Sequence, residues 1–302
     1  MLSDELLLLD ADVAPFVPAP RTYAGNMCGV RVPGLPPVAG GAADPSLVLS
    51  WFYDRYGPAD QARIRAAWAE RGDLDVLLSW PDSRAIGQTA PQFAATCGAL
   101  IGQGFRPCVF LCSKDYDPPD VPVIEARIAE VLPLLIGLVP RICVGWELSI
   151  WLSPTQVQAL IDWLAPLVNG YGGKLYVHFQ VWYFAFQQPG HVTADFWWSN
   201  VGKLAGILHQ SDTRYPKPEF QARLKDCLDR FAGGFGYPAD SGFGHPFDCI
   251  ACEITAQAQF NGQMSEADGD YWGQWALATP ATVGPFGPVA IMGSGNGHTE
   301  GA

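Results

Sequence analysis

The sequence predicts an α/β protein whose main unit is a (β/α)8 (TIM) barrel. Eight short apolar runs recur over residues 47–294, and their starts lie 28 to 46 residues apart. Runs of this length without polar alternation are typical of strands that are buried on both faces of a parallel sheet. Most intervals between the runs have helical patterns, and eight strand–helix units over about 250 residues are the pattern of this barrel. An open doubly wound sheet is the competing architecture. No GxGxxG follows a strand and no GxxxxGK(S/T) is present, which disfavours a nucleotide-binding version of it.

The predicted strands are five to seven residues long and mostly apolar. They are Leu47–Trp51, Asp75–Trp80, Pro107–Cys112, Arg141–Glu147, Leu175–Gln180, Lys203–His209, Cys249–Thr255 and Pro288–Gly293. The predicted helices follow proline or capping residues, and several end near glycine, as helices commonly do. They are Ala59–Arg71, Pro91–Gln103, Pro122–Gly137, Thr155–Val168, Pro218–Phe231 and Ser265–Leu277, with Ser153 as the N-cap of the fourth.

Residues 1–46 differ in composition from the rest of the chain, because seven prolines interleave with five glycines. This pattern predicts an N-terminal extended arm or cap, with residues 47–302 forming the barrel. A packed cap and an arm that docks on a partner are both compatible with it. Asp4 and Glu5 stand where a secretory signal carries positive charge, so we expect no signal peptide and a protein made in the cytoplasm.

Acidic residues outnumber basic ones by 30 to 18, which gives a net charge of −12. A surface this negative repels phosphate backbones and anionic lipid, so we expect no nucleic-acid partner and no membrane partner. We also expect no cofactor and no metal. The five histidines form no HxH or HxxxH pair, and the CxxC at Cys249–Cys252 stands alone, which disfavours a metal-dependent hydrolase. Most cysteines are expected to be small buried hydrophobes.

Two glutamates are the candidate catalytic residues. Reacting groups in a (β/α)8 barrel stand at the carboxyl ends of the strands, and Glu147 and Glu253 lie at the ends of the fourth and seventh runs. A carboxylate at the end of a buried apolar strand lowers the stability of the fold unless it pairs with a cation or faces a polar pocket. Strand alternation places Glu147 on the face of Gly145, and Glu253 on that of Ala251, so small residues leave room beneath each acid. The fourth and seventh strands lie roughly across a barrel, so both acids can reach one ligand.

Paired carboxylates across a pocket are the groups that cleave glycosidic bonds. One carboxyl group protonates the leaving oxygen, and the other attacks the sugar carbon or activates water. Aromatic faces and polar side chains near the strand ends suit a sugar ligand. The candidate substrate-binding residues are Trp51, Trp80, Trp146, His178, Gln180, Trp182 and Asn296.

The motifs GWELS (145–149) and ACEIT (251–255) resemble those of clan-A retaining glycoside hydrolases, which are (β/α)8 barrels. The resemblance implies that Glu147 is the acid/base and Glu253 the nucleophile. The chain differs from that clan at Trp146, where the clan usually has an asparagine.

The general composition of the chain, rather than any motif, also resembles that of bacteriophage-encoded hydrolase-like barrels. It is acidic, has no expected signal peptide, and carries the arm GVRVPGLPPVAGG (29–41). This resemblance implies a virion or tail component that acts on, or holds, host surface glycan, with other virion or tail proteins docking on residues 1–46.

Two functions therefore stay open. The first is a glycosidase that cleaves a cell-surface or other polysaccharide by the retaining mechanism. The second is a catalytically inactive barrel that serves as a structural or glycan-binding component of a larger assembly, such as a virion. The spacing between the two carboxyl groups separates them, because retention needs about 5–5.5 Å.

Each candidate residue also has a structural alternative. Glu147 could be a rim acid paired with Arg84 or Arg106, Glu253 a polar rim residue, and His178 a core histidine. We expect the acids that follow the third run to be solvated loop residues, because two prolines interrupt the spacing of a calcium loop. These acids are Asp115, Asp117 and Asp120.

Overall fold

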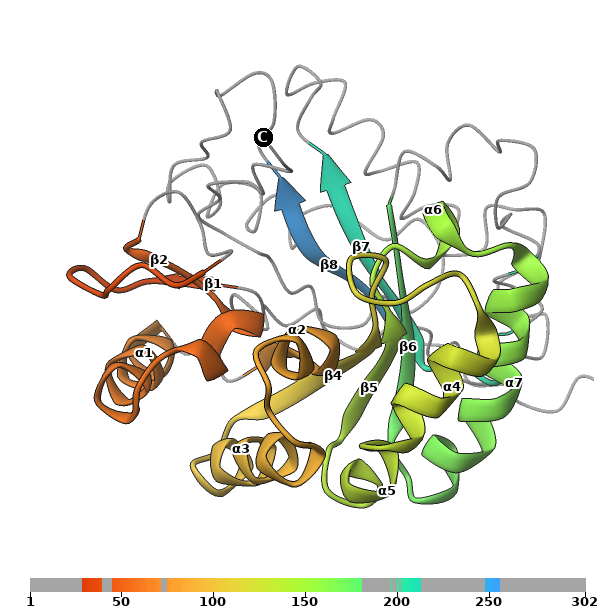
Figure 1. Cartoon of the computed structure of the whole chain (residues 1–302), viewed down its shortest axis with the longest axis horizontal. Helices are drawn as coiled ribbons and strands as arrows, with labels where there is room; N and C mark the ends of the chain where they lie inside the picture. The colour runs from red at the N-terminus through yellow and green to blue at the C-terminus, as the bar shows by residue number, and fades with distance from the viewer. Residues whose placement is uncertain are drawn as a thin grey trace, which may run out of the picture.

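A six-stranded, all-parallel sheet forms the centre of the computed structural model, which describes residues 29–39, 45–71, 75–180, 196, 200, 202–212 and 248–255. Each strand of this sheet pairs with the next along the chain (Figure 1). The strands are β3 (Asp75–Ser79), β4 (Arg106–Cys112), β5 (Arg141–Gly145), β6 (Lys174–Gln180), β7 (Gly206–Asp212) and β8 (Asp248–Thr255). The order confirms the mixed α/β class, and five of the second to seventh predicted strands begin within one residue of the observed strands. The sixth, predicted as Lys203–His209, lies three residues further along the chain, at Gly206–Asp212.

The first predicted strand, Leu47–Trp51, is shorter than expected and has a different partner. Strand β2 (Leu47–Leu49) pairs antiparallel with β1 (Gly29–Arg31) in a separate two-stranded sheet. The chain then turns into the 3-10 helix η1 (Ser50–Arg55). A strand would send consecutive side chains to opposite faces, whereas η1 buries Trp51, Phe52 and Tyr53 together. Part of the predicted N-terminal extension is thus strand-paired with the start of the main unit.

Three predicted elements lie outside the described residues: helix Pro218–Phe231, helix Ser265–Leu277 and strand Pro288–Gly293. Within the described ranges, no ladder joins β3 to β8. The described part is therefore an open parallel sheet, and its closure into a barrel stays a prediction.

The helices lie between the strands as the sequence predicts. They are α1 (Pro58–Arg71), α2 (Trp80–Ala85), α3 (Ala90–Gly102), α4 (Val121–Ala129), α5 (Leu132–Leu135), α6 (Leu148–Trp151) and α7 (Pro154–Gly170). One predicted helix is divided into α4 and α5, and the short helices α2 and α6 were not predicted. The predicted helix 122–137 is split in two, because Pro133 has no N–H to donate to the carbonyl of Ala129, where α4 ends. Ser153 caps α7 as predicted, in a capping box with Gln156.

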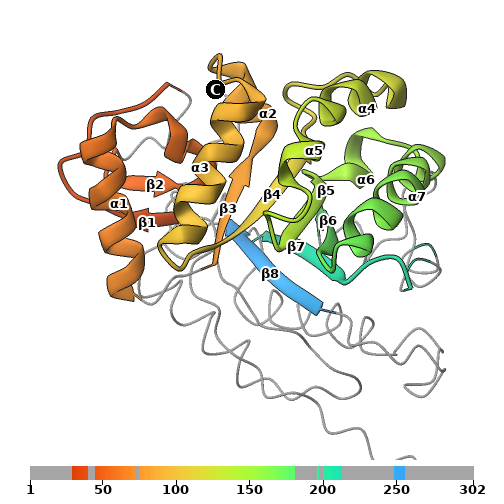
Figure 2. The same ribbon diagram turned by 90° about the horizontal axis from the view of Figure 1, so that it is seen from below.

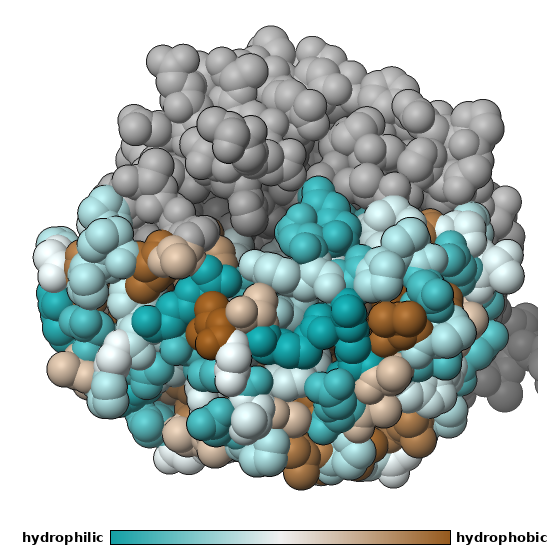
Figure 3. Space-filling model, viewed as in Figure 1, coloured by the Kyte–Doolittle hydropathy of each residue, from teal (hydrophilic) through white to brown (hydrophobic). Residues whose placement is uncertain are grey.

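Helices α3, α5 and α7 lie along one face of the sheet (Figure 2). All five residues of β3 are buried, and so are the last six of β4, so both faces of these strands are covered. The face shown in Figure 3 is mostly hydrophilic, with hydrophobic residues interspersed. No helix within the described ranges has the length and apolar character needed to span a bilayer.

A buried ion cluster fixes the amino ends of three neighbouring strands. Asp75 opens β3 with its side chain almost completely buried, and its two carboxylate oxygens bind Arg106 of β4 at 2.9 Å and Arg141 of β5 at 2.7 Å. Asp75 lies opposite Arg106 in the ladder. Because two guanidinium groups neutralise one buried carboxylate, this cluster also favours the observed register of the three strands.

Candidate functional site

The carboxyl ends of β3, β4 and β5 bring together charged side chains from three loops. Asp82 follows β3 in α2, Lys114 is the second residue after β4, and Glu147 is the second residue after β5. This edge of a parallel sheet is where reacting groups are usually placed, because short loops there hold side chains on rigid strand ends.

Glu147 is the central residue of the site. Its side chain is buried, and its Oε2 lies 2.5 Å from the Nζ of Lys114, which is about one-third exposed. The sequence suggested Arg84 or Arg106 as an ion-pair partner. Arg84 instead pairs with Asp117, and Arg106 with Asp75, so the predicted ion-pair partner of Glu147 was wrong.

The backbone at Glu147 has an unusual conformation. Its φ of 44° and ψ of 40° are left-handed, and it is the sole non-glycine residue with positive φ within the described ranges. Such a conformation costs about 1–3 kcal/mol and persists only where the surroundings enforce it. Here the N–H of Glu147 donates to Nδ1 of His178 at 2.9 Å. The strand alternation predicted for this acid therefore ends at Gly145.

An aromatic cluster packs beneath this turn. The ring of Trp146 stacks on Phe110 with centroids 3.9 Å apart and planes within 3°, and it meets His178 and Trp51 edge-on. The N–H of Trp146 donates to the carbonyl of Cys112, and its own carbonyl accepts from the indole of Trp151. Both main-chain groups of Trp146 are therefore fixed just before the turn.

The room predicted beneath Glu147 is filled. A Cβ at Gly145 would lie 2.3 Å from Sγ of Cys112 and 2.6 Å from its carbonyl oxygen. That sulfur also lies 3.1 Å from the carbonyl of Val144. Glycine is needed here for close approach of two strands, and it does not open a cavity.

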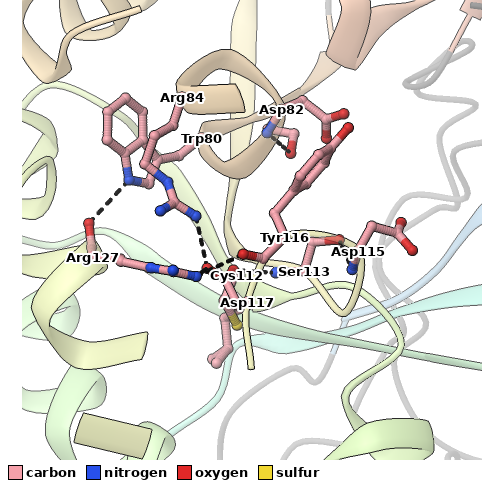
Figure 4. A network of polar contacts seen from close by, with 11 residues as sticks. Trp80, Asp82, Arg84, Cys112, Ser113, Asp115, Tyr116, Asp117 and Arg127 are labelled. Carbon is pink, nitrogen blue, oxygen red and sulfur yellow. Dashed lines mark hydrogen bonds and ion pairs between the residues drawn. The ribbon is translucent and has the colours of Figure 1, made fainter. Parts of the chain in front are cut away.

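A second buried carboxylate fixes the loop that carries Lys114 (Figure 4). Arg84 of α2 and Arg127 of α4 converge on Oδ1 of Asp117, at 2.8 and 2.7 Å. The other oxygen, Oδ2, accepts the backbone N–H of Ser113 at 2.9 Å. The side chain of Asp117 is almost completely buried, so this carboxylate joins two helices to the end of β4.

The three loop acids have three different roles. Asp115 is exposed, as predicted. The prediction was wrong for Asp117, because its side chain is buried and pairs with two partly exposed arginines. Asp120 is the N-cap of α4 and accepts the N–H of Val123. Asp120 precedes Val121-Pro122, and an acid before a proline at the start of an apolar helix is the sequence signal that identifies such a cap.

Sequence reasoning did not select a third acidic group, around Asp82. This buried carboxylate binds Arg55 at 3.2 Å and is hydrogen-bonded to Tyr116, whose ring extends toward it in Figure 4. Burial raises the pKa of Asp82, and the hydrogen bond from Ser79 and the charge of Arg55 offset part of that rise. Its position at the end of a buried strand, in Trp80-Pro81-Asp82, is the signal that could have identified it.

Asp54 is a partly buried acid with a measurable pH signature. Ser83 donates to its Oδ2 at 2.8 Å. Burial raises the pKa of Asp54, and hydrogen bonds with Ser83, Thr96 and Gln88 offset this rise in part. Because the pKa is higher in the folded state than in the unfolded state, the folded protein binds the proton more tightly. The ionised group therefore lowers stability at neutral pH, and this cost disappears as the pH falls below the unfolded pKa.

We expect Asp54→Asn to be more stable than the wild type near neutral pH, because the substitution removes the partly buried charge. A gain of about 1 kcal/mol corresponds to a rise of about 2–4 °C in Tm. The gain should shrink as the pH is lowered to about 3.5, where the wild-type carboxyl group is also neutral. Thermal unfolding of both proteins across this pH range measures the difference. A gain that stays constant with pH would contradict the assignment.

The structure separates the predicted substrate-binding residues into two groups. Trp51, Trp80, Trp146 and His178 are buried, at 4%, 1%, 9% and 0% exposure. The indole N–H of Trp80 donates to the carbonyl of Arg127. In this structure these rings pack in the core beneath the site.

The other predicted residues are described in part or not at all. Glu253 is in β8 with its backbone opposite Gln210, and Gln180 ends β6, but the side chains of Glu253 and Gln180 lie outside the described part. Trp182 and Asn296 lie outside the described residues altogether. The distance between the carboxyl groups of Glu147 and Glu253 therefore stays a prediction.

Four cysteines whose side chains the structure describes behave as small hydrophobes. Cys97, Cys108, Cys112 and Cys143 are buried thiols. Burial raises the pKa values of Cys97 and Cys112, so these thiols are poor nucleophiles. Over the described ranges, no three His, Cys, Asp or Glu side chains are grouped so that they could hold a metal ion.

No family model matches this chain, and no curated protein matches it. Among solved structures, it is similar to a mutant of xylanase A from P fluorescens subsp. cellulosa in complex with xylopentaose. That likeness has 9% identity and a TM-score of 0.47, and it covers 84% of each chain. It is also similar to the GH53 catalytic domain of Ignisphaera aggregans, with 12% identity and a TM-score of 0.39, over 91% of this chain and 88% of that one.

Proposed function

We propose that this protein is a retaining glycoside hydrolase, with Glu147 as the acid/base and Glu253 as the nucleophile. The observation that carries the proposal is the state of Glu147. It is a buried carboxylate at the carboxyl edge of a parallel sheet, on a strained left-handed backbone. Backbone strain and buried charge both cost stability, and they are typically retained together at functional sites.

The sheet order supports a second carboxylate at the same edge. Glu253 lies near the carboxyl end of β8, which follows β5, β6 and β7 in the sheet. Three strand spacings of about 4.8 Å amount to roughly 14 Å along a flat sheet, and curvature shortens that separation. In this proposal the two glutamate side chains extend from the same edge of the curved sheet and both reach one sugar.

The proposed reaction has two steps. In the first step Glu147, released from its ion pair with Lys114 and protonated, donates a proton to the glycosidic oxygen while the carboxylate of Glu253 attacks the anomeric carbon, which breaks the C–O bond and forms a glycosyl ester. Water then attacks the same carbon and gives its proton to Glu147, and Glu253 leaves as the carboxylate. Two displacements retain the configuration of the sugar.

Covalent trapping tests this proposal. A panel of dinitrophenyl 2-deoxy-2-fluoroglycosides is incubated with the protein, and the intact mass is measured. We expect one sugar of the panel to add one glycosyl group, and peptide mapping to place it on Glu253, because fluorine slows both steps while the dinitrophenolate leaving group speeds only the formation of the ester. Glu253→Gln is the control that forms no adduct. An adduct on another carboxylate, or neither adduct nor turnover with any sugar of the panel, would overturn the proposal.

The second function predicted from the sequence is an inactive barrel in a larger assembly. Neither similar structure is described as a virion protein. The virion role, and the docking of partners on residues 1–46, stay predictions from the general composition of the sequence. Carbohydrate is the proposed partner in both cases.

A further inference from the structure

The Glu147 turn is held by a side chain from the neighbouring strand. His178 lies in β6, which pairs with β5, and it is completely buried. Its Nδ1 accepts the backbone N–H of Glu147 at 2.9 Å. Strand β5 ends at Gly145, so this N–H lies beyond the residues of β5 that pair with β6, and a side-chain acceptor on β6 takes the place of a strand carbonyl.

The acceptor role fixes the chemical form of the ring. A neutral imidazole has one donor nitrogen and one acceptor nitrogen, whereas the imidazolium ion has two donors. Acceptance at Nδ1 therefore requires the neutral ring with its proton on Nε2. The ring is held in orientation by Trp146, edge-on at 4.6 Å, and by Phe110, edge-on at 5.6 Å.

The neighbouring main-chain contacts show what His178 adds. The turn is preceded by Trp146, whose N–H donates to Cys112 and whose carbonyl accepts from Trp151. Those contacts fix the residue before the acid. The bond to His178 holds the backbone of Glu147 itself, from which the carboxylate extends toward Lys114.

We propose that His178 is a positioning residue that sets the backbone conformation of Glu147 and so places its carboxylate for catalysis. The inference rests on the proposed function for its catalytic consequence, while the structural step stands on the hydrogen bond alone. A shift of about 1 Å in a reacting group can lower the rate by about 100-fold, so a single backbone bond is enough to matter.

Two substitutions separate the acceptor from the ring. His178→Asn can place an amide oxygen near the position of Nδ1, so it keeps an acceptor for the Glu147 N–H. His178→Phe keeps an aromatic ring and loses the acceptor. Phe110→Leu is the packing control, because it disturbs the same aromatic cluster without removing the bond to Glu147.

The first measurement is amide hydrogen exchange of Glu147 in the full-length 15N-labelled protein. We expect exchange to be about tenfold faster in His178→Phe, and close to wild type in His178→Asn and Phe110→Leu. The second is kcat on the glycoside that the trapping panel identifies. We expect kcat to be about 100-fold lower in His178→Phe, with Asn restoring most of it.

The outcomes separate this inference from the proposed function. Unchanged exchange of the Glu147 amide in His178→Phe would overturn the positioning role, as would equal loss of kcat in the Asn, Phe and Phe110→Leu variants. If the wild type turns over no glycoside but the exchange pattern holds, the catalytic role of the site is overturned and the structural role of His178 is supported.

Discussion

Glu147→Gln is expected to lower kcat/KM by about 10²–10⁴-fold on glycosides with poor leaving groups, the range typical of general acid–base catalysis. Glutamine keeps the size of the side chain but cannot donate the proton that the leaving oxygen needs. The loss should be much smaller for dinitrophenyl glycosides, whose leaving group departs without protonation. Glu253→Gln should remove turnover with both kinds of substrate, because it removes the nucleophile. Steady-state assays with a leaving-group series measure this contrast.

A matched control is available at the same edge of the sheet. Asp115 is an exposed acid one residue after Lys114, so Asp115→Asn removes a nearby negative charge and should leave kcat/KM close to wild type. Stability should change little in Glu147→Gln, within about 1 kcal/mol, because glutamine keeps the size of the side chain and its amide oxygen can still accept a hydrogen bond from Lys114. If Glu147→Gln and Asp115→Asn lose activity equally, or if leaving-group ability makes no difference, Glu147 is not the acid.

Asp117→Ala is expected to lower the free energy of unfolding by about 3 kcal/mol, the low end of the cost of breaking a buried ion pair on one side, because Arg84 and Arg127 are partly exposed. The substitution leaves Arg84 and Arg127 without their shared carboxylate and removes the acceptor for the N–H of Ser113. Chemical denaturation followed by circular dichroism measures the loss.

The matched control for this effect is Asp162, which also pairs with a cation, Lys203 at 2.6 Å, but is about half exposed. Asp162→Ala should cost less than about 1 kcal/mol, because solvent screens an exposed pair. Similar costs for Asp117→Ala and Asp162→Ala would show that burial of the Asp117 network does not strengthen it.

The central sheet could be predicted because buried parallel strands are nearly continuous apolar runs. Arg106–Cys112 and Arg141–Gly145 are of this kind, with charge only at their first residues. Ser153 followed by Pro154 likewise predicts a helix start from local chemistry alone. The pairing of β2 with β1 was not predictable in this way, because each strand has only three residues and their partners are set by tertiary contacts.

The site was predictable in position but not in its contacts. Glu147 was selected because a lone carboxylate ends an apolar run. Its ion-pair partner was misassigned because the sequence does not show which long cationic side chain reaches it. That partner is Lys114, which lies in the loop after the neighbouring strand β4. The role of His178 was missed, because the sequence does not show which side chain accepts the backbone N–H just beyond the end of β5.

The tight contact between Gly145 and Cys112 has a consequence for recognising distant relatives of this chain. A smaller side chain at position 112 would remove the contact between its sulfur and a Cβ at position 145. The contact with the backbone carbonyl of residue 112 would remain, because every amino acid has that carbonyl. Homologues that preserve this strand pair should therefore keep glycine two places before the acid, even after the surrounding letters have diverged. A glycine two residues before a glutamate at the end of a predicted strand is therefore a pattern that can identify relatives whose remaining sequence has diverged.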